Sequence, residues 1–192
     1  MNAQGHIHVR DYRDSDEPSW LRCRALSFLG SQYFDDVKSR RTVFDGRALC
    51  LVSADGPVGS SRIVGILDVE ISGSTATIDT LASHPDYARR GVASALFTAA
   101  LPRLADLGVS SIDAWTREDV AANAWYRRHG FSEVFRYLHV YKSWDDDSAG
   151  FTSPPGLSAP VHALAHAPIE LEPEVRRRFR RVYVCRRYLR AI

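Results

Sequence analysis

The chain has 192 residues, of which 45% are hydrophobic and 25% are charged. This length buries one sizeable core and leaves little room for two independent domains, so we expect a single domain over residues 1–192. The 25 Lys and Arg residues nearly balance the 23 Asp and Glu residues, which excludes a general electrostatic argument for nucleic acid, membrane or acidic partners.

The cysteines and the apolar segments indicate in which compartment the protein is expected. Cys23, Cys50 and Cys185 are far apart, odd in number and without a CxxC pair, which disfavours a disulfide framework or a thiolate zinc site. The N-terminus lacks an apolar signal core, and the longest apolar-rich run, Val92–Leu101, is much shorter than the roughly 20 residues of a membrane helix. We therefore expect a cytoplasmic protein that does not enter a membrane.

The first half of the chain predicts strands around one helical region. Apolar and polar residues alternate over Ile7–Asp11, which indicates a half-exposed strand. Apolar residues recur at helical spacing over Pro18–Phe28, and after Gly30 we expect a short helix around Phe34–Arg41. Three β-branched runs separated by turn residues then predict an antiparallel meander: Arg47–Ser53, Arg62–Ile71 and Thr75–Ser83.

The second half predicts alternating helices and strands. Helical spacing indicates two helices, Gly91–Leu107 and Val120–His129. Runs rich in β-branched and aromatic residues indicate three strands, Ser110–Trp115, Phe131–Trp144 and Phe179–Leu189. Thr116 with Asp119 is expected to begin the second helix as a capping box. The Pro-, Gly- and Ser-rich stretch 145–173 predicts a functional or disordered loop, after which the last strand returns beside the strand at 131–144.

The turn after Thr75–Ser83 has the layout of an anion site. The first turn of a helix carries unsatisfied backbone N–H groups and a partial positive charge, so a diphosphate can bind there. Arg89 and Arg90 add charge, and Ser94 adds a hydroxyl donor. The N–H groups come from Gly91, Val92, Ala93 and Ser94. The alternative interpretation is an ordinary strand-to-helix turn with solvated arginines.

Two motifs carry a family resemblance. Arg89-Arg90-Gly91-Val92-Ala93 resembles the pyrophosphate loop of the GNAT acetyltransferase superfamily, with Ala88 where Gln or Arg is usual, so Arg89 is expected to make that contact. The segment Asn123–Phe131 is similar to the family's Asn, aromatic-Tyr pair and Gly-Phe. With the order of elements, the resemblance covers nearly the whole chain. It implies the α/β GNAT fold, a mixed, mostly antiparallel twisted sheet of about seven strands flanked by about four helices.

The same resemblance implies acetyl-coenzyme A as the acyl donor, with no metal, and gives roles to two residues of the second motif. Asn123 would help to hold the pantetheine arm, and Tyr126 would give a proton to the departing coenzyme A sulfur. The residues are three apart on one predicted helix, so their side chains point to the same side. A phenol of pKa about 10 and a thiol of pKa about 8.5 are close enough for this transfer. Alternatively, Asn123 is a mid-helix polar residue and Tyr126 a core aromatic.

The resemblance also assigns the strand that precedes the turn. Its last residues, Leu81, Ala82 and Ser83, would pair with the pantetheine amides like an added strand, and one backbone N–H in this stretch would hold the acetyl oxygen. An amine attacks only when neutral, so a proton acceptor is needed. Asp79 is our candidate, on the same strand face as Leu81, because its position resembles that of a family acid or base.

Glu70 and Glu133 are alternative proton acceptors. Cys23, Cys50 and Cys185 lie outside both motifs, so we expect direct attack in a ternary complex rather than an acetyl-cysteine intermediate. His162 and His166 are four apart, but no third ligand is evident, so no metal site is expected.

The acceptor is expected to be an amine of a small molecule or peptide. By the family pattern it lies between the first helical region and the loop 145–173. An aromatic and acidic wall would come from Tyr33, Phe34, Asp35 and Asp36. Asp145, Asp146 and Asp147 would attract a cation, or form a solvated charge run. Acceptor identity and acyl-chain preference stay open, and a homodimer is compatible with the sequence.

Two other function classes remain. One is a sensor that binds an acyl-coenzyme A without turnover. The other is a nucleic-acid-binding module that uses the Arg-rich C-terminus, whose arginines would neutralise phosphates. These are Arg176, Arg177, Arg178, Arg180, Arg181, Arg186, Arg187 and Arg190. The interleaved apolar residues instead favour a strand whose arginines are solvated or meet acidic neighbours, so nucleic acid is the less favoured partner.

Overall fold

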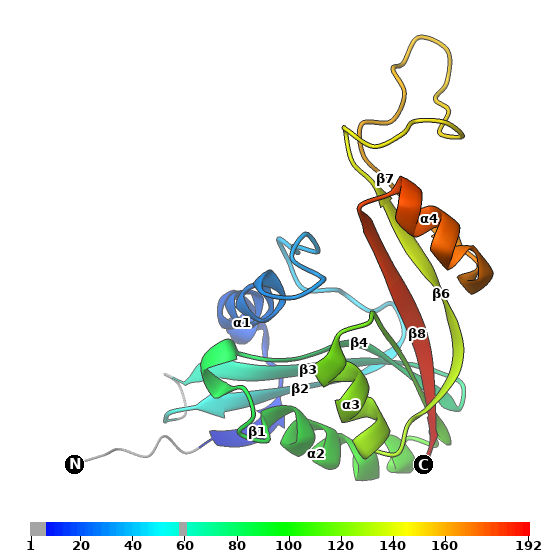
Figure 1. The fold of residues 1–192 in the computed structure, drawn as a ribbon. Helices are drawn as coiled ribbons and strands as arrows, with labels where there is room; N and C mark the ends of the chain where they lie inside the picture. Colours follow the sequence, from blue (N-terminus) through cyan, green and yellow to red (C-terminus); the bar gives the residue numbers. More distant parts are fainter. Residues whose placement is uncertain (1–6, 58–60) are drawn as a thin grey trace. The chain divides into compact units, whose positions relative to one another are not determined.

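The computed structural model describes residues 7–57 and 61–192 (Figure 1). These residues form two compact units. The first unit comprises the described residues up to Ala114 together with Arg190–Ile192, and the second comprises Trp115–Leu189. The single domain over residues 1–192 stays a prediction.

The first unit is built on a sheet of five consecutive strands. The antiparallel neighbours are β1 (Ile7–Asp11), β2 (Arg47–Asp55), β3 (Arg62–Ser72) and β4 (Thr75–Ser83). β5 (Ser111–Thr116) then pairs with β4 in parallel. The predicted first strand, the meander and the strand at 110–115 are confirmed. The three C-terminal residues Arg190–Ile192 also belong to this unit, and the Ile192 N–H donates to Ser110 O at 3.0 Å.

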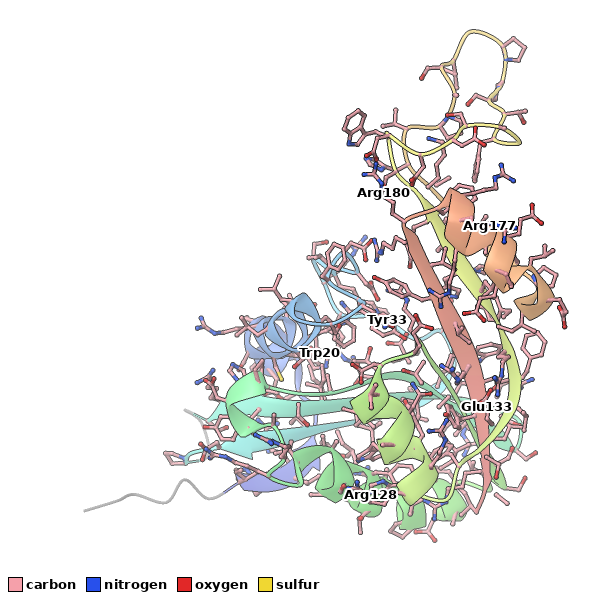
Figure 2. All side chains as sticks on the ribbon, in the orientation of Figure 1. Trp20, Tyr33, Arg128, Glu133, Arg177 and Arg180 are labelled. Carbon is pink, nitrogen blue, oxygen red and sulfur yellow. The ribbon has the colours of Figure 1, made fainter. Side chains whose placement is uncertain are left out.

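Two helices cover opposite faces of this sheet (Figure 1). Helix α1 (Glu17–Leu29) follows the 3-10 turn Asp14–Asp16 and buries Trp20 fully against Val52 and Ile66 (Figure 2). Helix α2 (Val92–Asp106) packs on the other face at Gly65, where an added Cβ would overlap Val92 and lie 3.0 Å from Leu96. Gly65 therefore lets the start of α2 approach the backbone of β3.

The second unit contains a three-stranded antiparallel sheet in the order β8-β6-β7. The strands are β6 (Ser132–Lys142), β7 (Ala163–Ala167) and β8 (Arg181–Ala191). The unit also holds α3 (Val120–Arg128), the 3-10 turn Ile169–Leu171 and α4 (Glu172–Arg178). Apolar residues of α4, β6 and β8 form its core: Leu138, Val140, Val175, Phe179, Val182 and Val184. The predicted return of the last strand beside the strand at 131–144 is confirmed.

Among the described residues there are eight strands and four α-helices, and the predicted mixed, mostly antiparallel α/β fold is confirmed. The eighth strand was not expected: β7 lies inside the stretch 145–173, which was predicted to be a loop. Helix α4 was also missed. Within that stretch, the residues before β7 form no helix or strand. In the part of the chain described here, no helix combines the length and hydrophobicity needed to span a bilayer.

Two local predictions are wrong. No helix forms around Phe34–Arg41, because the segment between α1 and β2 is held by side-chain bonds to its neighbours rather than by its own backbone ladder. Thr116 does not cap α3. Asp119 is the N-cap, and its carboxylate accepts the Ala122 N–H at 2.7 Å. Thr116 instead ends β5 as a buried residue.

Candidate functional site

The turn between β4 and α2 is strained. Arg89 has φ 61° and Gly91 has φ 78°, and Arg89 is the one non-glycine residue with positive φ among those that the structure describes. A left-handed conformation at a residue with a side chain costs roughly 1–3 kcal/mol and tends to occur at functional sites. Alternating left-handed residues turn successive N–H groups toward one side, which makes an anion-binding concavity.

The same turn opens toward solvent. Arg89, Arg90 and Gly91 are exposed, and a Cβ placed on Gly91 would meet no atom within 4 Å. The first intrahelical bond of α2 runs from Ala95 N–H to Gly91 O at 2.8 Å, so the N–H groups of the preceding residues point out of the helix start. Buried Val92 fixes this helix start on the sheet. Residues 89–94, which were predicted to bind pyrophosphate, are thus brought together in one accessible, positively charged turn.

β4 leaves its parallel neighbour in the middle of its length. β4 and β5 pair over Thr75–Ile78 and Ser111–Ala114, and β4 then continues from Asp79 to Ser83 along β3. Alternate residues of an antiparallel strand direct their N–H and C=O groups away from the paired side. The stretch with Leu81, Ala82 and Ser83 therefore has the geometry needed for an added strand. The Ser83 carbonyl already accepts the Ser27 hydroxyl at 2.8 Å.

Asp79 lies at the point of divergence. The register of β3 and β4 passes from Asp68–Thr80 to Val69–Ile78, so Asp79 is the extra residue of a β-bulge. Bulges re-aim side chains and are common beside active sites. The Asp79 carboxylate is 28% exposed, forms an ion pair with Lys38 at 3.3 Å and accepts the Thr80 hydroxyl at 2.9 Å. Neither the bulge nor the ion pair between Asp79 and Lys38 was predicted from the sequence.

The two alternative proton acceptors differ from Asp79 in their surroundings. Glu70 is exposed on β3 opposite Thr77. Glu133 belongs to the second unit, where it is surrounded by arginines, the nearest being Arg136 at 2.6 Å. A buried carboxylate that was not predicted, Asp68, lies across from Thr80.

Asp68 and Arg41 form a buried ion pair that holds the segment between α1 and β2 on the sheet. Arg41 Nε donates to Asp68 Oδ2 at 2.9 Å, and the guanidinium lies 4.2 Å from the centroid of the Tyr12 ring. Burial raises the pKa of Asp68, and Arg41 opposes that rise. The Arg41 backbone N–H also donates to Glu17 at 2.9 Å.

The predicted acceptor wall lies on this same segment. Tyr33 packs its ring 5.5 Å from Phe28, whereas Phe34 is 47% exposed. Asp36 has a structural bond: its carboxylate and its carbonyl accept from Arg24 at 2.9 and 2.6 Å. Of the four predicted residues, Asp36 therefore anchors the segment to α1, while Phe34 and Asp35 are exposed.

In the second unit, Asn123 is bonded on both ends of its amide. Nδ2 donates to the carbonyls of Arg117 and Asp119 at 2.7 and 2.6 Å, and Oδ1 accepts the Tyr188 hydroxyl at 2.8 Å. Both amide hydrogens are used, and Oδ1 keeps one further acceptor site. Asn123 therefore ties the entry of α3 to β8, a role that the spacing alone did not reveal.

Tyr126 is enclosed by aromatic rings. It stacks on Tyr188 at 5.3 Å with an angle of 14°, and meets the edges or faces of Phe131 and Trp125 at 5.2 and 5.3 Å. It is 7% exposed. The predicted neighbours Asn123 and Tyr126 thus both contact Tyr188, a residue that neither motif indicated.

The cysteines are poor nucleophiles in this fold. Burial raises the pKa of Cys23 and of Cys50 to about 11 and also raises the pKa of Cys185. A protonated thiol attacks slowly, which agrees with the expectation of direct transfer. Among residues 7–57 and 61–192, no three His, Cys, Asp or Glu side chains gather in a way that could hold a metal ion.

The C-terminal arginines meet acids and rings. Arg176 pairs with Glu118 at 3.0 Å and with Glu172 at 2.8 Å, and Arg178 pairs with Asp147 at 3.2 Å. Further pairs are Arg180 with Asp145, Arg186 with Glu133, Arg181 over Tyr141 and Arg187 over Trp115. This agrees with the interpretation of a strand whose arginines meet neighbours. It also shows that Asp145 and Asp147, predicted to attract a cation, are used within the unit.

Residues 7–131 match the Acetyltransferase (GNAT) family, and the chain belongs to that family. It is similar to a mycothiol acetyltransferase from Clavibacter michiganensis subsp. michiganensis, with 36% identity over 137 residues, 67% of this chain and 43% of that protein. The chain thus spans less than half the length of this curated relative.

Two solved structures share the fold. The ribosomal-protein-S18-alanine N-acetyltransferase from Escherichia coli matches with a TM-score of 0.59 and 14% identity, over 97% of this chain and 94% of that chain. PaiA N-acetyltransferase from Thermoplasma acidophilum in complex with coenzyme A matches with a TM-score of 0.55 and 13% identity, over 67% and 91%. At these identities the likeness concerns the fold alone.

Proposed function

We propose that this chain transfers an acetyl group from acetyl-coenzyme A to an amine of a small molecule or peptide, by direct attack in a ternary complex. The observation that carries the proposal is the turn at Arg89–Gly91, which accepts backbone strain and presents charge and N–H groups to solvent. Family membership supports the same reaction class.

The first unit would hold the acyl donor. Arg89 and Arg90 and the N–H groups of Gly91–Ser94 would bind its diphosphate, and the outward groups of Leu81–Ser83 would pair with its pantetheine amides. The open turn and the divergence of β4 from β5 give these groups the access that such a ligand needs. When bound, acetyl-coenzyme A supplies an activated thioester carbonyl.

Asp79 would attract the cationic amine and accept its proton, directly or through water. Lys38 now holds that carboxylate at 3.3 Å, so the incoming ammonium would have to replace the lysine. Backbone N–H groups next to the bulge would stabilise the negative charge that develops on the carbonyl oxygen.

Tyr126 would give a proton to the departing sulfur. Three aromatic neighbours fix its ring, which leaves the hydroxyl little freedom. Tyr126→Phe keeps the packing and removes the proton, so we expect slower thiol release with nearly unchanged donor binding. Full turnover by Tyr126→Phe, when chemistry limits the rate, would remove this role.

The proposal is tested by thermal unfolding with and without acetyl-coenzyme A. Ligand at about 100 times its dissociation constant adds roughly 2.7 kcal/mol of stability. Arg89→Ala should weaken binding at least about tenfold, because hydrogen bonds to charged groups contribute about 1.5–3 kcal/mol. Arg13→Ala, which removes an exposed arginine of the same unit, is the matched control.

The outcomes separate the function classes. Binding that depends on Arg89, together with thiol release in the presence of amines, supports the enzyme. Binding without thiol release for any amine would make the chain an acyl-coenzyme A sensor. No shift at millimolar ligand would refute both.

A further inference from the structure

The second unit contains a cavity that the proposed reaction has not used. It has a volume of about 950 Å³ and is lined by residues of β5, β6, β7 and the turn before α4. Pockets that bind small molecules measure roughly 300–1,000 Å³ and combine apolar walls with a few polar groups. This cavity lies entirely within Trp115–Leu189.

Its walls are aromatic. Trp115 meets Phe135 at 6.3 Å and Tyr137 at 5.7 Å, both edge to face, and Phe135 stacks near Tyr137 at 5.9 Å. The ring centroid of His166, on β7, lies 4.8 Å from that of Tyr137. Trp115 is 39% exposed and Phe135 is 53% exposed. Large rings left accessible in a concave site offer faces and edges to another planar ring.

One side of the cavity is rich in positive charge. Glu133 lies among three guanidinium groups, with Arg136 Nε at 2.6 Å, Arg186 Nε at 3.4 Å and Arg127 Nη2 at 3.9 Å, and Figure 2 shows Glu133 on the β6–β8 sheet. Each guanidinium has about five N–H donors, whereas a carboxylate has about four acceptor sites. The cluster therefore keeps donors for a second anion.

Arg136 is the member of this cluster that lines the cavity with Glu133, and its side chain is 51% exposed. The other acidic residue of the lining is Glu170, in the turn before α4. A ligand carboxylate would avoid Glu170 and bind at Arg136. The cavity thus favours a flat ring against Trp115 and Phe135 with an anionic group on the arginine side.

We infer that this cavity binds an aromatic α-amino acid whose ring lies against Trp115 and Phe135 and whose carboxylate binds Arg136. This binding does not depend on the proposed function.

Calorimetric binding of the whole chain tests the inference with L-tryptophan, tryptamine, L-leucine and glucosamine. Tryptamine lacks the carboxylate and leucine lacks the ring, so both should bind at least about tenfold more weakly than tryptophan. Trp115→Ala and Arg136→Gln should each weaken tryptophan binding by about the same factor. Trp144→Ala is the matched control, because Trp144 is 74% exposed in the same unit and lies outside the cavity.

Measuring thiol release from acetyl-coenzyme A with the same amines distinguishes a failure of the inference from a failure of the proposed function. A chain that acetylates leucine or glucosamine but neither binds nor acetylates tryptophan refutes the inference and keeps the proposed function. Tryptophan binding that Trp115→Ala leaves unchanged also refutes the inference. Tryptophan binding that depends on Trp115, without any thiol release, would support the inference and refute the proposed function.

Discussion

Truncation of Asn123 distinguishes a structural role of its amide from a role in binding acetyl-coenzyme A. Asn123→Ala removes three hydrogen bonds and leaves the Arg117 and Asp119 carbonyls and the Tyr188 hydroxyl without these partners. All three bonds lie within the second unit, at the junction between α3 and β8. We therefore expect a loss of stability larger than that of an ordinary mid-helix Asn→Ala change.

The magnitude follows from the burial of the three groups. A buried polar group left without a partner costs about 1–3 kcal/mol. Water can reach the partly buried Asp119 carbonyl, so the total is closer to about 2–4 kcal/mol than to the full sum. For a chain of this size, 1 kcal/mol moves the midpoint of thermal unfolding by about 2–4 °C, so we expect a decrease of about 5–15 °C.

The assay is thermal unfolding of wild type and Asn123→Ala, each with and without saturating acetyl-coenzyme A. Asn123→Asp adds a second test, because an ionised carboxylate cannot donate to the two carbonyls. It should destabilise more at pH 7 than at pH 5, where part of it is protonated and can donate one bond. If Asn123→Ala moves the midpoint by less than about 1 °C but weakens acetyl-coenzyme A binding tenfold, the structural reasoning is wrong.

Three further predictions concern the bulge at Asp79, the contact of Gly65 with α2 and the half-buried His139. Asp79→Asn should move the pH profile of acetyl transfer to higher pH or abolish activity, and an unchanged profile would exclude Asp79 as the proton acceptor. Gly65→Ala should lower the free energy of unfolding by about 1–3 kcal/mol through overpacking against α2, which the urea midpoint would report. Burial, with Arg117 and His166, lowers the pKa of His139 from 6.5 to about 4, so the folded state binds fewer protons than the unfolded state in that range. Stability should therefore fall as pH drops from 6.5 toward 4, and fall less in His139→Gln than in the exposed control His162→Gln.

The fold was predictable where local pattern and tertiary context agree. The runs 62–71 and 75–83 are rich in β-branched residues and form β3 and β4, and the apolar-rich run 47–53 lies in β2. β7 was missed because Ala163–Ala167 contains three alanines and no β-branched residue, and it is held as a strand by its pairing with β6. Helix α4 is only seven residues long, too short for a periodic pattern to identify it.

Sequence could indicate which candidate site residues lie together only where they are close in the chain. Residues 89–94 are consecutive and span the turn and the first residues of α2, and Asn123 and Tyr126 are three apart on α3. Sequence could not give the bulge at Asp79, because register depends on the pairing with β3. It could not give the aromatic cavity either, because Trp115 and His166 are distant in the chain and meet only after β5, β6 and β7 have formed.

Two ion pairs hold the segment between α1 and β2. The segment supplies the carboxylate in one pair and the guanidinium in the other. Near its start, Asp36 accepts from Arg24 of α1, and near its end, Arg41 donates to Asp68 of β3. Gln32–Asp35 take part in neither of these two ion pairs. A library that randomises Gln32–Asp35 while keeping the four paired residues would test the proposed acceptor wall without removing either ion pair.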